Sequence, residues 1–409
     1  MKKATVVFLV SMFLLVSAVA VFAQQFDDII KIGAAVSLTG KTAYEGQMVK
    51  RGYEVWEKWV NEHGGIKADG KTYGVEVLYY DDESDPVRSA RLTERLITED
   101  NVNFLAGPYS SSITFATTAI GEKYGVITIA STANARNIYE RGYKNVFSVL
   151  PPAPLLMAPI AYMMDEVLEP RPKTVAIVVA NDLFPLDVAT GFNDICTELG
   201  FDVVMFEKYP PGSTDLSALL TKVKALDADI LAGGGYTADA LMILRQCKEL
   251  DYTPKMFASI VGVFVPGFLK EIGADGNYAV EGEWWVPAMK TEDHIFGTTE
   301  NYLQACIDMF GDDFIANYQT AAASATVSII QMAIEKAGTI ETEQVRDALK
   351  SFDVIELACF SPVEFAENGE NIQWEHPVIQ IQNEVVKVVY PLSSQESAPL
   401  YPAPTWKER

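Results

Sequence analysis

The chain has 409 residues, with 55 acidic and 32 basic side chains and a formal net charge of −23. An acidic excess of this size argues against nucleic acid or an anionic membrane surface as a partner. Hydrophobic residues make up 49% of the chain, and the length suits two domains of ordinary size rather than a single core.

The first 23 residues have the form of a secretory signal peptide. A basic MKK start is followed by an apolar segment from Ala4 to Ala23, with small residues before the expected cleavage after Ala23. A retained membrane anchor is the alternative interpretation. No cysteine follows the apolar segment to carry a lipid. We therefore expect a soluble protein in the periplasm of a bacterium with two membranes.

Short β-branched runs alternate with amphipathic helical stretches along most of the remaining chain. In the first half the strand-like runs are IKIGAAVSL, VEVLYYDD, NFLAG and VITIAS, and the helical stretches are 45–63, 87–99 and 111–124. Alternating strands and helices predict βαβ units on a parallel sheet.

The pattern breaks at the proline-rich segment 150–154 and then starts again. The second half contains TVAIVVA, DVVMFEKY and DILAGGG, with helical stretches at 156–168, 187–199, 215–226 and 238–250. Beyond Gly282 come the helical stretches 298–310, 317–337 and 342–351, the strand-like VIQIQ and EVVKVVY, and a proline-spaced tail at 392–409. The sequence therefore predicts two similar α/β halves joined near residue 151.

The cysteines and histidines give no sign of a metal site or a cofactor, and we expect neither. The residues concerned are Cys196, Cys247, Cys306, Cys359, His63, His294 and His376. They lack the close spacing of zinc ligands. If the second half has a two-one-three strand order, right-handed crossovers place the helices that carry Cys196 and Cys247 on opposite faces of the sheet. We therefore expect these two cysteines not to form a disulfide.

The turn AGPYSSS, at the end of the strand NFLAG, is a candidate anion site. Ligands of open parallel sheets bind beyond the carboxyl ends of the strands. Ser110, Ser111 and Ser112 would offer hydroxyls and free backbone N–H groups at a helix N-terminus. The alternative is that these serines only cap the helix.

Two enzyme classes deserve comparison with this interpretation. The segment from Ala35 to Thr42 fits a relaxed phosphate-loop spacing, but its four central residues, VSLT, include no glycine to allow the tight wrap around a phosphate. The serines lie on a strand-to-helix turn, as a hydrolase nucleophile would, but the Gly-x-Ser-x-Gly pattern is absent. We therefore expect no enzyme activity.

Five segments, taken together and in order, resemble the periplasmic binding proteins for leucine, isoleucine and valine. They are IKIGAAVSLTGKTAYEGQ, NEHGGIKADGKTYGVEVLYYDDESDP, AGPYSSS, VITIASTANA and the GGGY that ends at Tyr236. The resemblance covers nearly the whole chain beyond the signal peptide. It implies an ABC-importer receptor with two Rossmann-like lobes of parallel sheet and flanking helices, joined by three crossover strands.

The resemblance also implies how the chain is divided and what it contacts. Lobe one would comprise 27–150 and 282–357, and lobe two 151–281 and 358–391. The expected partners are a small-molecule ligand, bound by closure of the lobes, and an ABC permease in the inner membrane, with the receptor itself a monomer. A chemosensory receptor of the same fold is the alternative.

The residues that match the family's binding positions come from both lobes. The ligand carboxylate would be held by Ser110 or Ser111 and by Thr132 with Asn134. Aromatic positions of the site match Tyr44, Tyr109, Phe184 and Tyr236.

Three departures from the family pattern concern this site. Ser84 and Tyr109 lie where family members close a small disulfide, so this turn must hold its shape by packing. Phe184 replaces a tyrosine and loses its hydroxyl. The family's acid for an amino acid's ammonium falls at Ile260 or Val261.

The apolar Ile260 and Val261 bear on the class of ligand. A buried ammonium without a partner costs several kcal/mol. The sequence therefore predicts a carboxylate-bearing ligand that need not be an ordinary amino acid, such as an apolar or aromatic acid. The competing hypothesis is that Asp182 or Asp239 reaches the ammonium from another loop.

Overall fold

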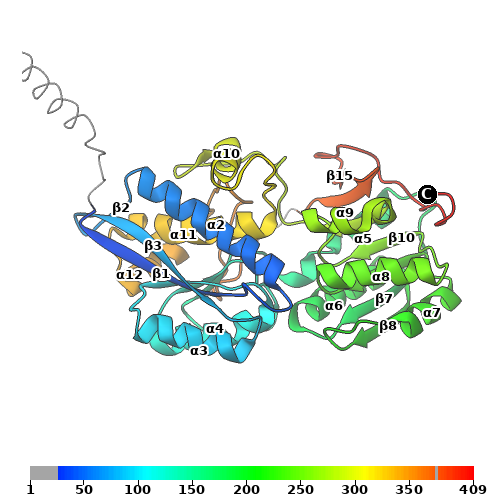
Figure 1. The fold of residues 1–409 in the computed structure, drawn as a ribbon, viewed down its shortest axis with the longest axis horizontal. Helices are drawn as coiled ribbons and strands as arrows, with labels where there is room; N and C mark the ends of the chain where they lie inside the picture. The colour runs from blue at the N-terminus through cyan, green and yellow to red at the C-terminus, as the bar shows by residue number, and fades with distance from the viewer. Residues whose placement is uncertain (1–25, 374–375) are drawn as a thin grey trace, which may run out of the picture.

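The computed structural model describes residues 26–373 and 376–409, and it shows two lobes side by side (Figure 1). Each lobe contains a largely parallel sheet with helices packed on it, which confirms the expected α/β class. The expected signal peptide, residues 1–23, lies outside the described residues. Among the residues that are described, no helix is both long and apolar enough to cross a bilayer.

The first sheet has the strand order β2-β3-β1-β4-β5-β6. All its pairings are parallel except that of β2 with β3. The strands are β1 (Asp28–Val36), β2 (Ile66–Ala68), β3 (Lys71–Asp81), β4 (Phe104–Ala106), β5 (Thr128–Ala130) and β6 (Val146–Ser148). The order β3-β1-β4 is the two-one-three arrangement of a doubly wound sheet.

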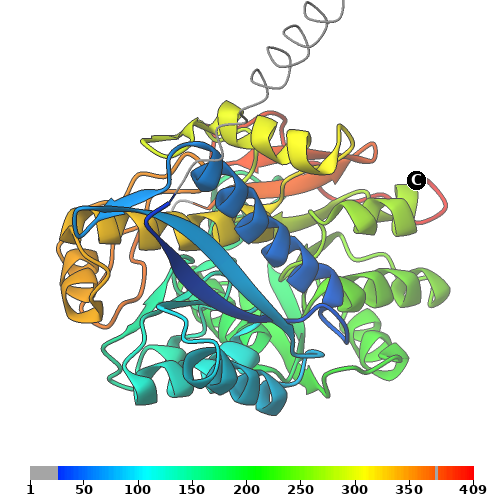
Figure 2. The ribbon, with the colours of Figure 1, turned by 60° about the vertical axis from the view of Figure 1, so that its left-hand side comes forward.

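Helices cover both faces of this sheet. They are α2 (Ala43–Glu62), α3 (Pro86–Thr98), α4 (Ser111–Tyr124), α10 (Thr299–Phe310), α11 (Tyr318–Ala337) and α12 (Thr342–Lys350), with the short 3-10 helix η1 (Arg136–Ile138) and the small hairpin β12 (Glu292–Asp293) and β13 (Gly297–Thr298). Helix α2 runs alongside β1 and β3 in Figure 2 and packs against α11. Every residue of α11 from Tyr318 to Ile334 is buried.

The second sheet has the order β15-β14-β11-β10-β9-β7-β8. Its strands are β7 (Thr174–Ala180), β8 (Asp202–Tyr209), β9 (Ile230–Gly234), β10 (Met256–Ser259), β11 (Ala279–Gly282), β14 (Val378–Gln382) and β15 (Val385–Tyr390). Its helices are α5 (Ala158–Glu166), α6 (Leu183–Glu198), α7 (Ser217–Leu226), α8 (Thr237–Glu249) and α9 (Pro266–Ile272), with the 3-10 helices η2 (Ala153–Leu155) and η3 (Gly273–Gly276).

The side chains of β7 point alternately to the two faces of the second sheet, and helices cover both faces. Val175, Ile177 and Val179 pack with α5 and α6 in one hydrophobic cluster. Ala176 and Val178 pack with α7, α8 and α9 in another. A strand buried on both sides reads as a continuous apolar run, as TVAIVVA does.

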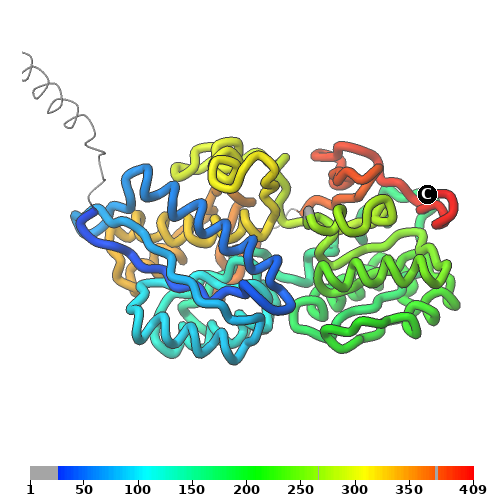
Figure 3. The backbone as a smooth tube through the Cα atoms, viewed as in Figure 1, coloured from blue at the N-terminus to red at the C-terminus, as the bar shows by residue number. Residues whose placement is uncertain are grey.

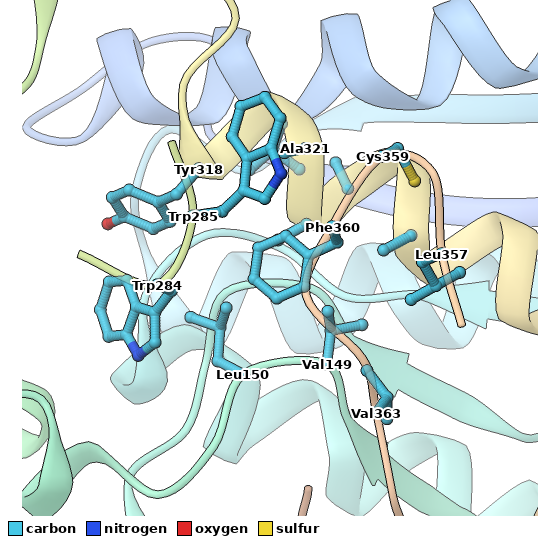
Figure 4. Packing of buried hydrophobic residues seen from close by; sticks show 14 of the residues in the cluster. Val149, Leu150, Trp284, Trp285, Tyr318, Ala321, Leu357, Cys359, Phe360 and Val363 are labelled. Carbon is cyan, nitrogen blue, oxygen red and sulfur yellow. The ribbon is translucent and has the colours of Figure 1, made fainter. Parts of the chain in front are cut away.

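The chain crosses between the lobes near 149–152 and near 283–288, and a third time between Asn371, which lies with the first sheet, and Val378, the first residue of β14 in the second sheet. The second and third crossings are joined by a hydrogen bond from the Glu283 N–H to the Pro377 carbonyl (2.8 Å). Figure 4 shows side chains of the first two crossings, including Leu150, Trp284 and Trp285, packed close to Tyr318 and Phe360.

One expected boundary differs from the structure. The resemblance implies that lobe two takes up the chain again at residue 358. In the structure, the Ser148 N–H of β6 donates to the Gly369 carbonyl (2.9 Å), and the Asn371 amide donates to the Val149 carbonyl (2.7 Å). The segment up to Asn371 therefore lies with the first sheet, and the third crossing follows it.

The four cysteines are free and buried. Cys196 on α6 and Cys247 on α8 belong to the clusters on opposite faces of the second sheet. Burial raises the pKa of both thiols to about 12. We expect a thiol reagent to modify none of the four in the native protein and all four after denaturation without reductant. A Cys196–Cys247 linkage in an unreduced peptide map would contradict the strand order.

The tail from residue 392 wraps over the second lobe, as the red part of the tube in Figure 3 shows. The Ala403 N–H donates to the Lys255 carbonyl (2.8 Å), and the Trp406 indole donates to the Tyr252 carbonyl (2.7 Å). The tail is therefore part of the second lobe's packing.

Candidate functional site

The serine turn lies where β4 ends and α4 begins, facing the second lobe. Ser110 has a positive φ of 75°, which is uncommon for a residue with a side chain, and its Oγ accepts a hydrogen bond from the Ile113 N–H (3.4 Å). Ser111 Oγ accepts from the Ala135 N–H (3.2 Å), in the loop after β5. Ser110 therefore does cap the helix, and the strained turn brings Ser110 and Ser111 to the carboxyl edge of the sheet.

Asp182 of the second lobe binds directly to this turn. Ser112 Oγ donates to Asp182 Oδ1 (2.6 Å), and the Tyr236 hydroxyl donates to Asp182 Oδ2 (3.4 Å). Lys41 Nζ lies 3.9 Å from the same carboxylate at the solvent rim. One of the two acids considered for a ligand ammonium is thus at the junction between the lobes.

The other acid, Asp239, has a local role. Its side chain accepts hydrogen bonds from the Tyr209 hydroxyl (2.8 Å) and from the Tyr236 N–H (2.9 Å) at the start of α8. These bonds hold the end of β8 and the first turn of α8 together.

Two further contacts join the lobes on either side of the serine turn. The Thr237 hydroxyl of lobe two donates to Glu45 Oε1 of lobe one (2.9 Å). Arg136 of lobe one forms an ion pair with Asp187 of lobe two (3.2 Å). A pocket of about 350 Å³ opens beside Glu45, and one of about 570 Å³ opens beside Arg136. The lobes are therefore in contact, with an opening to solvent on each side.

Five aromatic side chains, from both lobes and the second crossing, contact one another in a closed ring, which we call the aromatic cluster. Its members are Tyr109, Tyr236, Phe184, Trp284 and Tyr318. Successive ring centroids lie 6.0, 6.3, 5.9 and 4.6 Å apart in that order, and the circuit closes with the Tyr109 and Tyr318 hydroxyls 3.3 Å apart. Figure 4 shows Trp284 and Tyr318 side by side at the junction.

The structure brings four of the expected site residues into this junction: Tyr109, Ser110, Phe184 and Tyr236. Ser111 and Thr132 are buried next to it, at the start of α4 and just after β5. Other contacts are made at Ser84 and Tyr109, where family members close a disulfide. Ser84 Oγ accepts from the Thr42 N–H (3.1 Å) and donates to the Thr39 carbonyl (2.9 Å), while Tyr109 packs into the aromatic cluster.

The remaining expected residues have other surroundings. Asn134 is buried and donates to the Pro151 carbonyl of the first crossing (2.5 Å). Tyr44 is 36% exposed and lines the pocket beside Glu45. Ile260 and Val261 are buried in the loop after β10. Asn134 therefore contacts the hinge, and Tyr44 lies at the rim.

Sequence reasoning missed several buried residues of this junction. They are Glu45, Glu281, Glu283 and Tyr318. Burial raises the pKa of Glu45, Glu281 and Glu283, because the charged carboxylate loses its hydration. The one available signal was position: Glu45 follows the matched Tyr44, and Glu281 and Glu283 adjoin the paired tryptophans in EGEWW.

Two α/β lobes, three crossings and a buried aromatic and polar junction between the lobes define a two-lobed solute-binding protein. The chain belongs to the family described as periplasmic binding protein, whose model matches residues 29–383. This confirms the resemblance found in the sequence.

Named relatives and solved structures agree with this assignment. A leucine-, isoleucine-, valine-, threonine- and alanine-binding protein of Pseudomonas aeruginosa is 27% identical over 329 residues, covering 79% of this chain and 83% of that protein. A branched-chain amino acid transporter substrate-binding protein of Streptococcus pneumoniae, solved with isoleucine, has a TM-score of 0.77 at 21% identity, covering 89% of this chain and all of that one. A solute-binding protein of Rhodopseudomonas palustris, solved with 4-hydroxybenzoate, has a TM-score of 0.73 at 21% identity, with coverages of 93% and 99%.

Proposed function

We propose that the protein is the periplasmic receptor of an ABC importer and binds a small ligand with a carboxylate between its lobes. The main observation that supports this proposal is the serine turn, which lies buried against the second lobe beside the aromatic cluster. Ser110 and Ser111, with the free N–H groups at the start of α4, would hold the carboxylate, and Thr132 would support them. The aromatic cluster would enclose the apolar body of the ligand.

The partners of the serine hydroxyls favour binding over hydrolysis. Ser110 Oγ and Ser111 Oγ accept from backbone N–H groups, and Ser112 Oγ donates to a carboxylate. None of these three serines has a histidine among its described hydrogen-bond partners, as an activated nucleophile would need. The related proteins are named as solute-binding proteins.

Relatives are named or solved with amino acids and with another carboxylic acid, 4-hydroxybenzoate. A thermal-shift screen of amino acids, aliphatic acids and hydroxybenzoates tests the proposal. At least one carboxylate should raise the melting temperature, because it binds only the folded form. A screen in which no carboxylate stabilises the protein would overturn the proposed function.

Replacing Ser110 with alanine should weaken binding of the tightest carboxylate from that screen. The expected loss is about 1–3 kcal/mol, since one charge-assisted hydrogen bond disappears. The loss of the helix cap should also lower stability by about 1 kcal/mol, so calorimetric titration must be run well below the melting temperature. Ser217→Ala, at the start of α7 in the second lobe, is the matched control and should change neither quantity appreciably.

Export to the periplasm rests on the form of the first 23 residues and on the family. The mature chain should begin near Gln24 in a periplasmic extract. N-terminal sequencing checks this, and an intact Met1 recovered from the membrane fraction would contradict it.

A further inference from the structure

The carboxyl group of Glu45 is buried where the two lobes meet. Glu45 lies in the first turn of α2 in lobe one and is 4% exposed. Its Oε1 accepts a hydrogen bond from the hydroxyl of Thr237, the first residue of α8 in lobe two (2.9 Å). In Figure 1 one end of α2 reaches toward α8 across the junction. An acid of one lobe is therefore covered by the other lobe.

Part of the cover over Glu45 depends on the contact between the lobes. The pocket of about 350 Å³ beside Glu45 is lined on the lobe-two side by Thr237, Ala238, Leu241 and Val265. When the lobes separate, these residues move away and water reaches the carboxyl. Closure of the lobes therefore transfers Glu45 from water to a largely dry environment.

None of the lysine and arginine side chains that the structure describes forms an ion pair with Glu45. The two cations that line the same pocket, Lys41 and Arg245, pair with other acids. Lys41 Nζ lies 3.9 Å from Asp182, and an Arg245 guanidinium nitrogen lies 3.2 Å from Glu271. Moving a carboxylate out of water without a cation is unfavourable, and such a group takes up a proton instead.

The other titratable groups that face Glu45 are acidic or uncharged. Asp239, in the first turn of α8, repels the Glu45 carboxylate. The tyrosines that face it are Tyr44, Tyr109 and Tyr236. Burial raises the pKa of each of their hydroxyls, so all three are neutral. Burial is also the main cause that raises the pKa of Glu45; hydrogen bonds from the Glu45 N–H and the Thr237 hydroxyl oppose this rise, and Asp239 adds to it.

We propose that Glu45 is a proton-binding site that couples closure of the lobes to pH: its carboxyl takes up one proton from solvent as the lobes meet and returns it as they part. This inference goes beyond the proposed function, because it concerns the closing step and holds for any ligand bound between the lobes. The proton acts as a second ligand that binds the closed form more tightly than the open form. An acidic medium therefore favours the closed receptor.

The direction of the pH dependence follows from the two forms. In the open form the Glu45 carboxyl is hydrated and has the ordinary pKa of a glutamate, and in the closed form burial raises that pKa. At a pH below both values the carboxyl is neutral in either form, so closure buries no charge. As the pH rises through the interval between the two values, closure becomes progressively less favourable, and above both values it changes no further.

Small-angle scattering of the ligand-free protein tests this coupling without any assumption about the ligand. The radius of gyration of the wild type should be smaller at pH 5 than at pH 8, because a larger fraction of the protein is closed. Glu45→Gln keeps the shape of a neutral carboxyl, so it should remove this dependence and hold the radius near the wild-type value at pH 5. Glu62→Gln is the matched control and should keep the wild-type dependence, since Glu62 is an exposed acid at the end of the same helix.

Two results of the scattering experiment would overturn the inference. One is a wild-type radius that does not change with pH. The other is a pH dependence that persists in Glu45→Gln, which would assign the proton to the other buried acids of the junction, Glu281 and Glu283.

Calorimetric titration provides a second readout. Leucine and 4-hydroxybenzoate are titrated into the wild type and Glu45→Gln from pH 5 to pH 8, and the ionisation of the probe itself cancels in the ratio of the two affinities. The ratio of wild-type to variant affinity should fall by about threefold or more over this range, and by at most about tenfold per pH unit, the limit for one proton. A constant ratio would overturn the inference and leave the proposed function standing. If neither probe binds, the proposed function is weakened, and the scattering experiment alone decides the inference.

Thr237→Val tests the contact between the lobes at the proton site. Valine has nearly the shape of threonine but lacks the hydroxyl that donates to Glu45. This hydrogen bond stabilises the charged carboxylate, so its loss should raise the pKa of Glu45 further and move the pH dependence of the radius to higher pH. The loss of a merely structural contact would change the radius equally at every pH, and that result would contradict the inference. Melting curves at both pH values show that the variants are folded.

Discussion

Saturating ligand is expected to reduce the radius of gyration of the protein in solution. The contacts Ser112–Asp182, Glu45–Thr237 and Arg136–Asp187 all join the two lobes, so they form only when the lobes meet. A ligand bound between the lobes adds contacts to both and favours this closed arrangement. Small-angle scattering with and without ligand measures the change. At a hundredfold excess over its dissociation constant, the ligand should also stabilise the protein by about 2.7 kcal/mol.

Asp182→Ala should weaken closure, because the Ser112 and Tyr236 hydroxyls lose a common acceptor across the junction. The expected loss in ligand affinity is about 1–3 kcal/mol. Asp165→Ala is the matched control, since Asp165 pairs with Arg171 on the exposed surface of lobe two (2.7 Å). Closure fails as a mechanism if saturating ligand leaves the radius of the wild-type protein unchanged.

The alternation of strands and helices was sufficient to predict the α/β class and the strands β1, β3, β4, β5, β7, β8 and β9, because each βαβ unit is local in sequence. The strands β2, β6, β10 and β11 were not predicted. The boundary at 358 was misplaced for the opposite reason. The segment 358–373 has no long strand or helix, only isolated bridges such as Phe365–Asn371. Its place beside β6 depends on hydrogen bonds to residues more than 200 positions away, such as Asn371 to Val149. No local pattern encodes contacts of that kind.

The residues of the candidate site likewise fall into those that a local sequence pattern predicts and those that it does not. The serine turn could be found because a strand, a turn and a helix N-terminus follow one another in the chain. Tyr318 could not, because it comes from α11 and reaches Tyr109 of the turn only through tertiary packing. Asn134 was matched to the ligand from its place after β5, yet its amide binds the Pro151 carbonyl in the hinge. The position of a residue in a motif therefore predicted where its side chain lies, but not which group the side chain binds.

Trp56→Ala is expected to cause the largest loss of stability among these variants. Trp56 is fully buried on α2, and its indole N–H donates to Gln331 Oε1 on α11 (3.0 Å). Truncating a buried tryptophan removes its packing and leaves a cavity, at a cost of about 3–5 kcal/mol. The Gln331 acceptor also loses its partner in a buried environment. Urea unfolding followed by fluorescence and circular dichroism measures the change.

Two further substitutions separate the effect of lost packing from that of the lost hydrogen bond and provide a control. Trp56→Phe keeps most of the apolar volume and removes the hydrogen bond, so it should cost less than Trp56→Ala. Trp406→Ala is the control, because Trp406 is only half-buried in the tail on lobe two. Glu45 lies in the first turn of α2 and α11 starts at Tyr318, so the packing around Trp56 also fixes two parts of the junction. If Trp56→Ala costs no more than Trp406→Ala, the contact between α2 and α11 does not stabilise lobe one as we infer.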